Sequence, residues 1–185
     1  TKKQQEIINA CTDDTTKYVV GCFGRQAGKS FTAQNLLLKW VLEDNGSVGM
    51  WVSPVYSQSK KVFQELTETI SGAGLTKSVN KSELTIIFIN GSVLYFRSGE
   101  REDTLRGNTL TYLIVDEAAY IKNDVWNTVL RPTVLVKGKK VLFISTPKGR
   151  NWFYDVAMRG YNEEYPTYQT FHATSFDTPF ITAEE

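Results

Sequence analysis

An apolar run leads into a glycine-containing loop near the start of this 185-residue chain. The run covers residues 18–23 and is typical of a β-strand. The loop that follows it is Gly24-Arg25-Gln26-Ala27-Gly28-Lys29-Ser30. A loop that binds phosphate needs glycines so that backbone N–H groups approach the phosphate oxygens, a lysine that neutralises negative charge, and a hydroxyl that binds Mg²⁺. Gly28, Lys29 and Ser30 supply these groups, so the segment predicts a strand followed by a phosphate-binding loop.

The loop departs from the usual spacing at one position. The pattern G-x-x-x-x-G-K-[ST] places its first glycine at position 23, which is Phe23, whereas Gly24 stands one place later. A Gly-Lys-Ser triplet also occurs in polar turns with a solvated lysine. The helical pattern of residues 31–42 that follows the loop favours nucleotide binding over that alternative.

Further apolar runs alternate with helical patterns along the chain. Residues 48–52 precede a helical pattern over 57–70, and residues 110–115 and 140–144 form continuous apolar runs. Strands without polar alternation are typical of a parallel sheet that helices cover on both faces. Asn90-Gly91 between two β-type runs predicts a hairpin near 84–97. We therefore expect an α/β fold with a phosphate-binding loop and a mainly parallel central sheet flanked by helices.

The composition excludes several classes of function. Twenty-one basic and twenty acidic residues leave a net charge of +1, so no global field favours nucleic acid or membranes. Cys11 and Cys22 lack metal-binding spacing and favour reduced, buried thiols, while the single histidine, His172, is interpreted as structural or surface. No apolar run is long enough to cross a membrane. We expect one domain over residues 1–185.

The densest basic stretch of the chain has two interpretations, a patch that faces DNA or a solvated face. It comprises Lys137, Lys139, Lys140, Lys148 and Arg150.

Acidic residues follow one of the expected strands directly. The carboxyl ends of parallel strands gather at one edge of a sheet, where ligands bind. Asp116 is placed to hold Mg²⁺ opposite Ser30, and Glu117 to orient or deprotonate an attacking water. The alternative is a solvated acidic pair that caps the turn after it.

Two arginines are candidates for stabilising charge in a transition state. Arg25 lies inside the loop, and Arg106 lies on a charged segment ahead of the acidic strand. The alternative for Arg25 is a solvent-facing side chain, and for Arg106 a surface charge paired with Glu102 or Asp103. The sequence leaves these alternatives open.

Two other segments have weaker signals. An amide of Gln4 or Gln5, ahead of the loop, could read the edge of adenine, although an N-terminal glutamine is often simply exposed. Ser145-Thr146-Pro147 ends a strand, and Thr146 could sense a γ-phosphate; the alternative is an ordinary turn.

Together these residues resemble the ATPase domain of large terminase subunits, the DNA-packaging motors of tailed bacteriophages. This family tolerates the displaced first glycine of the loop. The motifs that carry the resemblance are, in chain order, Gln4-Gln5-Glu6-Ile7-Ile8, the loop from Gly24 to Ser30, Leu105-Arg106-Gly107 ahead of Tyr112-Leu113-Ile114-Val115-Asp116-Glu117-Ala118, and Ile144-Ser145-Thr146-Pro147-Lys148-Gly149-Arg150-Asn151-Trp152-Phe153-Tyr154.

The resemblance implies a P-loop NTPase fold of the ASCE or RecA-like type and hydrolysis of ATP with Mg²⁺. It implies that Ser30 and Asp116 hold Mg²⁺, that Glu117 is the catalytic carboxylate together with Lys29, and that Arg25 or Arg106 is the catalytic arginine. Ser145, Thr146 and Pro147 would couple hydrolysis to motion. The nucleotide-binding set that it implies is Gln4, Gln5, Gly24, Arg25, Gln26, Ala27, Gly28, Lys29, Ser30 and Phe31.

The resemblance also implies partners. They are double-stranded viral DNA, a portal protein, a small terminase subunit and further copies in a pentameric ring on the procapsid, in the cytoplasm of the infected host. As an isolated domain the chain would be a monomer with weak activity and no membrane association. Family members carry a C-terminal nuclease domain, and because this chain ends before one we expect no DNA cleavage.

Two alternative functions stay open. A superfamily-2-like helicase has a similar loop, acidic pair and Ser-Thr segment, but it needs a second RecA-like domain that does not fit within 185 residues. A switch that binds ATP but turns it over negligibly is the non-enzymatic alternative.

Overall fold

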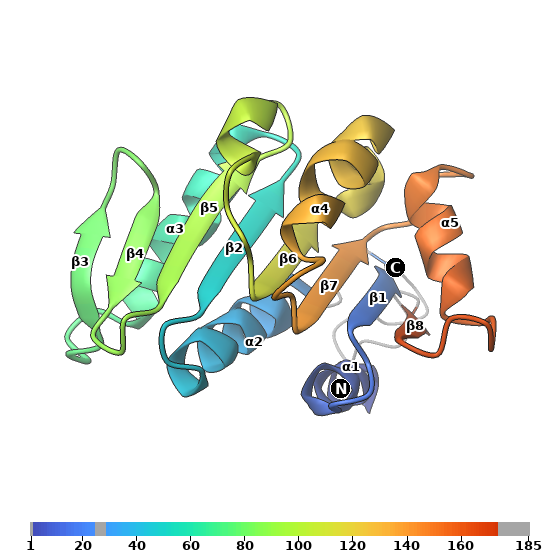
Figure 1. The fold of residues 1–185 in the computed structure, drawn as a ribbon, viewed down its shortest axis with the longest axis horizontal. Helices are drawn as coiled ribbons and strands as arrows, with labels where there is room; N and C mark the ends of the chain where they lie inside the picture. Colours follow the sequence, from blue (N-terminus) through green and yellow to red (C-terminus); the bar gives the residue numbers. More distant parts are fainter. Residues whose placement is uncertain (1, 25–28, 174–185) are drawn as a thin grey trace, which may run out of the picture.

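The computed structural model describes residues 2–24 and 29–173 of the chain. Its described part contains one eight-stranded sheet with strand order β3-β4-β5-β2-β6-β7-β1-β8 (Figure 1). The strands are β1 (Tyr18–Phe23), β2 (Val48–Ser53), β3 (Thr76–Asn80), β4 (Thr85–Phe88), β5 (Val93–Ser98), β6 (Tyr112–Asp116), β7 (Lys140–Ser145) and β8 (Tyr168–Ala173).

The strand directions confirm the predicted mainly parallel sheet. Strands β5, β2, β6, β7, β1 and β8 pair with one another in parallel. Strand β4 runs antiparallel to β5, which confirms the hairpin expected from Asn90-Gly91, and Gly91 has the positive φ of 82° that such a turn requires. The strands β1, β6 and β7 are buried throughout, as expected for strands covered on both faces.

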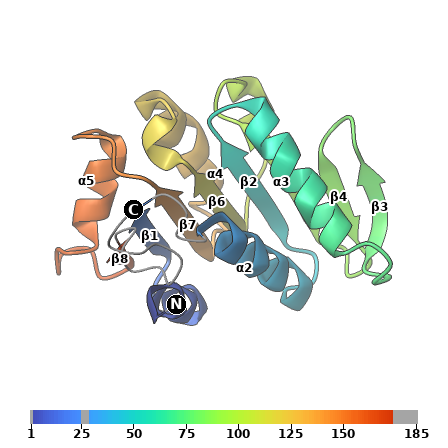
Figure 2. The same ribbon diagram turned by 180° about the vertical axis from the view of Figure 1, so that it is seen from behind.

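Helices cover both faces of the sheet. One face carries α1 (Lys2–Thr12), α2 (Lys29–Glu43) and α3 (Tyr56–Thr69). Helices α2 and α3 stand in front of the sheet in Figure 2. The other face carries the 3-10 segment η1 (Glu102–Leu105), the π-helical segment η3 (Val125–Leu130), α4 (Arg131–Thr133) and α5 (Trp152–Arg159). A short 3-10 segment, η2 (Ala118–Tyr120), follows β6.

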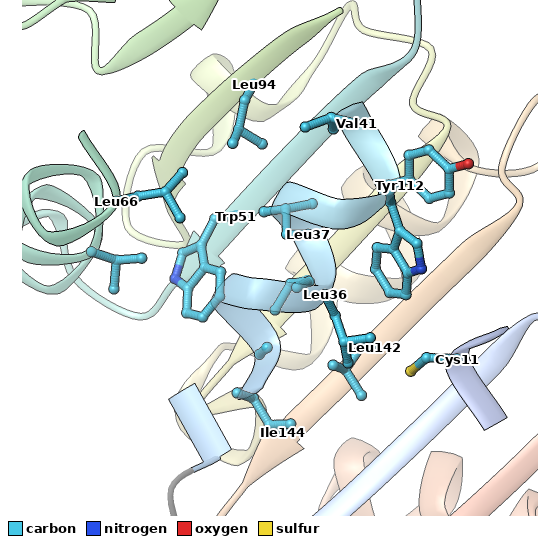
Figure 3. Packing of buried hydrophobic residues seen from close by; sticks show 14 of the residues in the cluster. Cys11, Leu36, Leu37, Val41, Trp51, Leu66, Leu94, Tyr112, Leu142 and Ile144 are labelled. Carbon is cyan, nitrogen blue, oxygen red and sulfur yellow. The ribbon is translucent and has the colours of Figure 1, made fainter. Parts of the chain in front are cut away.

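The helix that follows the phosphate-binding loop is fixed by the core beneath it. Leu36, Leu37 and Val41 of α2 point onto the sheet toward side chains of β2, β5, β6 and β7 (Figure 3). Gly49 of β2 permits this close approach, because a Cβ there would stand 3.0 Å from side-chain atoms of both Val41 and Leu94. These contacts hold α2 against the sheet.

The two cysteines are buried and the single histidine lies at the surface, in agreement with the sequence-based expectation. Cys11 and Cys22 are free and buried, and burial raises the pKa of Cys11 to about 12 and of Cys22 to about 11. His172 is exposed on β8. No helix within residues 2–24 and 29–173 is long and apolar enough to span a bilayer.

Three parts of the fold differ from the sequence-based expectation. Strand β3 is an exposed edge strand of mostly polar residues, and β8 is only half buried, so neither has a clear apolar pattern. Each forms by pairing with a neighbouring strand: β3 pairs with β4, and β8 pairs with β1. The sequence of residues 126–130 predicts a helix up to Pro132, but the helical segment continues from η3 into α4, because a proline is tolerated in the first turn of a helix.

Candidate active site

Three strand ends meet at one edge of the sheet. Strand β7 lies between β1 and β6. Cys22 of β1 lies opposite Ser145 of β7, and Ile144 of β7 lies opposite Asp116 of β6. The chain segments that leave these strands therefore start at the same level, as the sequence predicts for the carboxyl ends of parallel strands.

The position of the displaced glycine has a structural explanation. Phe23 is the last residue of β1, is 3% exposed and packs in the core between the sheet and the helices α1 and α2. Gly24 follows the strand, and its backbone N–H donates to Ala173 O of β8 at 3.0 Å. Residue 23 is thus a core position, and the β1–β8 pairing extends to Gly24.

The lysine of the loop reaches the acidic strand end. Lys29 begins α2 and is buried, and its Nζ lies 3.5 Å from Glu117 Oε1. Ser30, in the same helical turn, is half-buried. Four members of the predicted site, Arg25, Gln26, Ala27 and Gly28, lie outside the described residues.

Asp116 is a buried carboxylate at the end of β6. It is 8% exposed, and its Oδ1 accepts a hydrogen bond from the backbone N–H of Glu117 at 2.9 Å. Burial, and next the negative charge of Glu117, raise the pKa of Asp116 to about 7. A bound divalent cation would offset this unfavourable burial of charge. Hydroxyl and carboxylate oxygens are the ligands that Mg²⁺ prefers, so Ser30 and Asp116 fit the ion.

Glu117 occupies an unusual backbone conformation. Its φ of 46° and ψ of 45° lie in the left-handed region, which costs a residue other than glycine about 1 kcal/mol or more. Its side chain makes no capping hydrogen bond to the turn that follows, against the capping alternative. Its Oε2 instead accepts from Thr146 Oγ1 at 3.3 Å. The carboxylate therefore lies between the lysine of the loop and the threonine that follows β7.

A cavity of about 530 Å³ opens beside this carboxylate. Glu117 and Thr146 line it together with Gln58 and Tyr120. Gln58 was missed in the sequence, although its place shortly after the carboxyl end of β2 is the kind of position that parallel sheets bring to a site. Its side chain is exposed.

The adenine candidates gather in a second cavity. It measures about 340 Å³ and lies between α1 and α2, where Gln4, Gln5 and Phe31 line it. Gln5 Nε2 donates to Asn9 Oδ1 at 2.9 Å, and the ring of Phe31 is 72% exposed. Asn35, which the sequence reasoning missed, also lines this cavity; it lies one helical turn after Phe31.

Arg106 stands apart from these groups. It follows η1, is exposed, and makes no ion pair or hydrogen bond with any residue that the structure describes. The expected alternative, a pairing with Glu102 or Asp103, is absent among the described residues.

Comparisons with known proteins were made on sequence and on structure. The family model described as the N-terminal region of the terminase large subunit, T4-like-virus type, matches residues 20–183. The terminase large subunit of Escherichia phage T5 is 35% identical over 179 residues, which is 95% of this chain and 41% of that protein. The terminase large subunit of Thermus phage G20c is 30% identical over 207 residues, 95% of this chain and 43% of that protein. The chain thus spans less than half the length of these curated relatives.

A solved structure has the same fold. The large terminase ATPase domain of Thermus phage P74-26 superposes with a TM-score of 0.80 and 30% sequence identity, covering 92% of this chain and 81% of that one.

Proposed function

The chain belongs to the T4-like-virus type of terminase large subunits and matches their N-terminal region, and on this premise we propose that it is the ATPase domain of a motor that packages phage DNA. Residues 1–185 would form a single domain of that motor. The contact of Lys29 with Glu117, and of Glu117 with Thr146, carries the proposal, because it joins a phosphate-binding lysine, a carboxylate and a polar sensor at one edge of the sheet.

Each group at this edge has a role in hydrolysis. Lys29 and the backbone of the loop hold the β- and γ-phosphates, and Ser30 and Asp116 hold Mg²⁺. When bound, the ion neutralises phosphate charge. Glu117 orients a water in line with the γ-phosphate and accepts its proton. Either Arg25 or Arg106 stabilises the charge that develops on the phosphoryl oxygens.

The cavity between α1 and α2 supplies the base site. We assign the adenine to this cavity, with an amide of Gln4 or Gln5 reading its edge and the exposed ring of Phe31 available for stacking.

Thr146 links the reaction to the rest of the fold. It holds the carboxylate that activates water, and it lies in the segment after β7. A change in the position of Glu117 during hydrolysis would therefore be transmitted to the Ser145-Thr146-Pro147 segment. We propose that this segment couples hydrolysis to movement of double-stranded DNA.

The remaining partners follow from the family. We propose that the chain acts in a homo-oligomeric ring, a pentamer, with a portal protein and a small terminase subunit at the procapsid in the host cytoplasm. In this assembly Arg106, which is exposed and unpaired among the described residues, is available to a neighbouring copy.

Hydrolysis measured against protein concentration tests the proposal. We expect the protein to hydrolyse ATP slowly, with activity abolished by a chelator of Mg²⁺. A specific rate that rises with concentration supports an arginine supplied by a neighbour, and a constant specific rate favours Arg25. A protein that binds ATP but does not hydrolyse it at any concentration would be a switch, and one that binds no ATP would overturn the proposal.

Mixing two inactive variants separates the arginines. Arg106→Ala mixed with Lys29→Ala, which keeps Arg106, should recover part of the activity if Arg106 acts on a neighbour. Absence of recovery would assign the role to Arg25.

A further inference from the structure

Two segments that are distant in sequence are joined along their whole length beside the active site. One is the turn of residues 117–121 after β6, and the other is the segment of residues 145–152 after β7. The described contacts, in order along the turn, are Thr146 Oγ1 to Glu117 Oε2, Ala119 N to Ser145 Oγ, Asn151 Nδ2 to Ala119 O, Lys148 Nζ over the ring of Tyr120, and Trp152 Nε1 to Ile121 O.

The side chain of Asn151 makes four hydrogen bonds, one of them to the turn of residues 117–121. Its Oδ1 accepts from the backbone N–H groups of Phe153 at 3.1 Å and Tyr154 at 3.2 Å, which makes it the N-cap of α5. Its Nδ2 donates to Ala119 O at 3.1 Å and to Lys148 O at 3.2 Å. The side-chain oxygen of Asn151 therefore caps α5, while its side-chain nitrogen donates to the turn that contains Glu117.

The peptide groups of Ala119 are held from both sides. Its N–H donates to Ser145 Oγ at 3.1 Å and its carbonyl accepts from Asn151. The turn is tight, because Tyr120 N donates to Glu117 O at 2.9 Å. Rotation of Ala119 would therefore move Glu117 as well.

The backbone of Glu117 explains why the turn has to be held. A residue other than glycine remains in the left-handed region only when the surrounding structure fixes it. The hydrogen bond from Glu117 N to Asp116 Oδ1 and the contacts to the segment of residues 145–152 are described interactions that can do this. Without them, relaxation of φ would swing the carboxylate away from Lys29 and Thr146.

We propose that Asn151 is a positioning residue for ATP hydrolysis, whose side-chain nitrogen holds the turn of residues 117–121 so that Glu117 faces the γ-phosphate. This inference rests on the proposed function. The competing explanation is that Asn151 only caps α5. The two explanations differ in which atom of the amide matters, the nitrogen or the oxygen.

The substitution Asn151→Asp separates these explanations. An aspartate keeps the oxygen that caps α5 and is an equally good N-cap, but it has no N–H to donate to Ala119 O. We expect kcat to fall by about 10-fold to 100-fold, because a misplacement of a catalytic group by about 1 Å has effects of this size. The KM for ATP and the Kd for a fluorescent ATP analogue should stay within about twofold of the parent.

Two further variants control for charge and for folding. Asn162→Asp makes the same chemical change at a residue whose Oδ1 accepts from Glu164 N outside the joined segments, and it should leave kcat unchanged. Trp152→Phe removes the donor to Ile121 O at the far end of the same turn and should lower kcat in the same direction with unchanged Kd. If Asn151→Asp fails to fold, the Trp152→Phe result decides.

The outcomes distinguish this inference from the function on which it rests. A parent that hydrolyses ATP beside an Asn151→Asp variant of equal kcat would overturn the inference alone. A fall in kcat matched by an equal fall in the fraction of molecules that bind nucleotide would also overturn it, since that is the result of partial unfolding. A parent that binds no nucleotide would overturn the proposed function and this inference with it.

Discussion

Charged side chains at the two ends of the central strands differ in their hydrogen-bond partners. At the amino end, Asp44 accepts hydrogen bonds from Lys139 at 2.7 Å and from the hydroxyl of Tyr112 at 2.8 Å. The hydrogen bond from Lys139 lowers the pKa of Asp44, with help from Tyr112. At the carboxyl end, burial and the charge of Glu117 raise the pKa of Asp116 to about 7.

The lysines show the same contrast. Lys140 at the start of β7 is buried, and its ammonium group donates to the backbone carbonyls of Asp13 and Thr16 in the loop before β1. Lys29 is equally buried but lies 3.5 Å from Glu117, a distance longer than a hydrogen bond. The charged groups at the amino end thus have close hydrogen-bond partners, whereas Lys29 and Glu117 at the carboxyl end lie farther apart.

The basic stretch of residues 137–150 is divided between the two ends of β7. Lys139 and Lys140 lie at the amino end of β7, whereas Lys148 and Arg150 follow its carboxyl end and lie over the rings of Tyr120 and Tyr154. The stretch is therefore two separate groups at opposite ends of a strand, which argues against one continuous patch for DNA.

Removal of the loop lysine should have the largest effect. We expect Lys29→Ala to abolish measurable binding of Mg²⁺-ATP, because the variant lacks the positive charge that we propose neutralises the β- and γ-phosphates. Lys61→Ala is the matched control, since Lys61 is exposed on α3 and pairs with Glu65. Isothermal titration of both variants measures the difference, and equal affinities would remove Lys29 from the site.

Neutralising Asp116 should stabilise the metal-free protein. The pKa of this carboxyl is 3.8 ordinarily and about 7 in the folded protein, so between these pH values the folded state binds more protons than the unfolded state. The unfolding free energy of the parent therefore falls as pH rises through this window. An asparagine side chain at this position does not ionise. We expect Asp116→Asn to unfold at higher denaturant concentration than the parent at pH 8, by at most about 4 kcal/mol, with the advantage shrinking toward pH 4. An advantage that is independent of pH would contradict the assignment.

At the amino end, loss of a buried charge should cost stability and leave function intact. Lys140→Met removes the donor for Asp13 O and Thr16 O, and we expect a loss of about 1–3 kcal/mol in urea unfolding. Affinity for ATP should not change. Lys137→Met, at an exposed neighbour, is the control with no expected loss. A large effect on ATP affinity in Lys140→Met would break the division between the two ends.

The smallest effect should come from Asp44. Its pKa is lowered in the folded state, so it contributes stability that is present above its unfolded pKa and lost as pH falls. We expect Asp44→Asn to lower the unfolding free energy slightly at pH 7, by less than about 1 kcal/mol for a pair near the surface, and the loss to shrink as pH falls below 3.8. The pH dependence should therefore have the opposite sign to that of Asp116→Asn, as followed by urea unfolding. The same sign in both variants would contradict the comparison.

The sequence predicted the parts of this fold that are encoded locally. The strand before the loop, the hairpin around Asn90-Gly91 and the strand that ends in Asp116 all have their own apolar or turn signal. Strand β8 has no such signal. It forms because its backbone pairs with β1, a contact between distant parts of the sequence. The hydrogen bond between Thr146 and Glu117 joins residues that are 29 positions apart, and the one between Asn151 and Ala119 joins residues that are 32 positions apart. Both therefore depend on the order of strands in the sheet.

Single-turnover hydrolysis by Glu117→Gln tests the central claim most directly. A glutamine keeps the shape of the side chain but cannot accept a proton from water, so the claim that the carboxyl end of the sheet hydrolyses ATP predicts unchanged ATP affinity and a rate at least about 100-fold lower, typical for loss of a general base. Equal single-turnover rates in the variant and the parent, at saturating Mg²⁺-ATP, would contradict it.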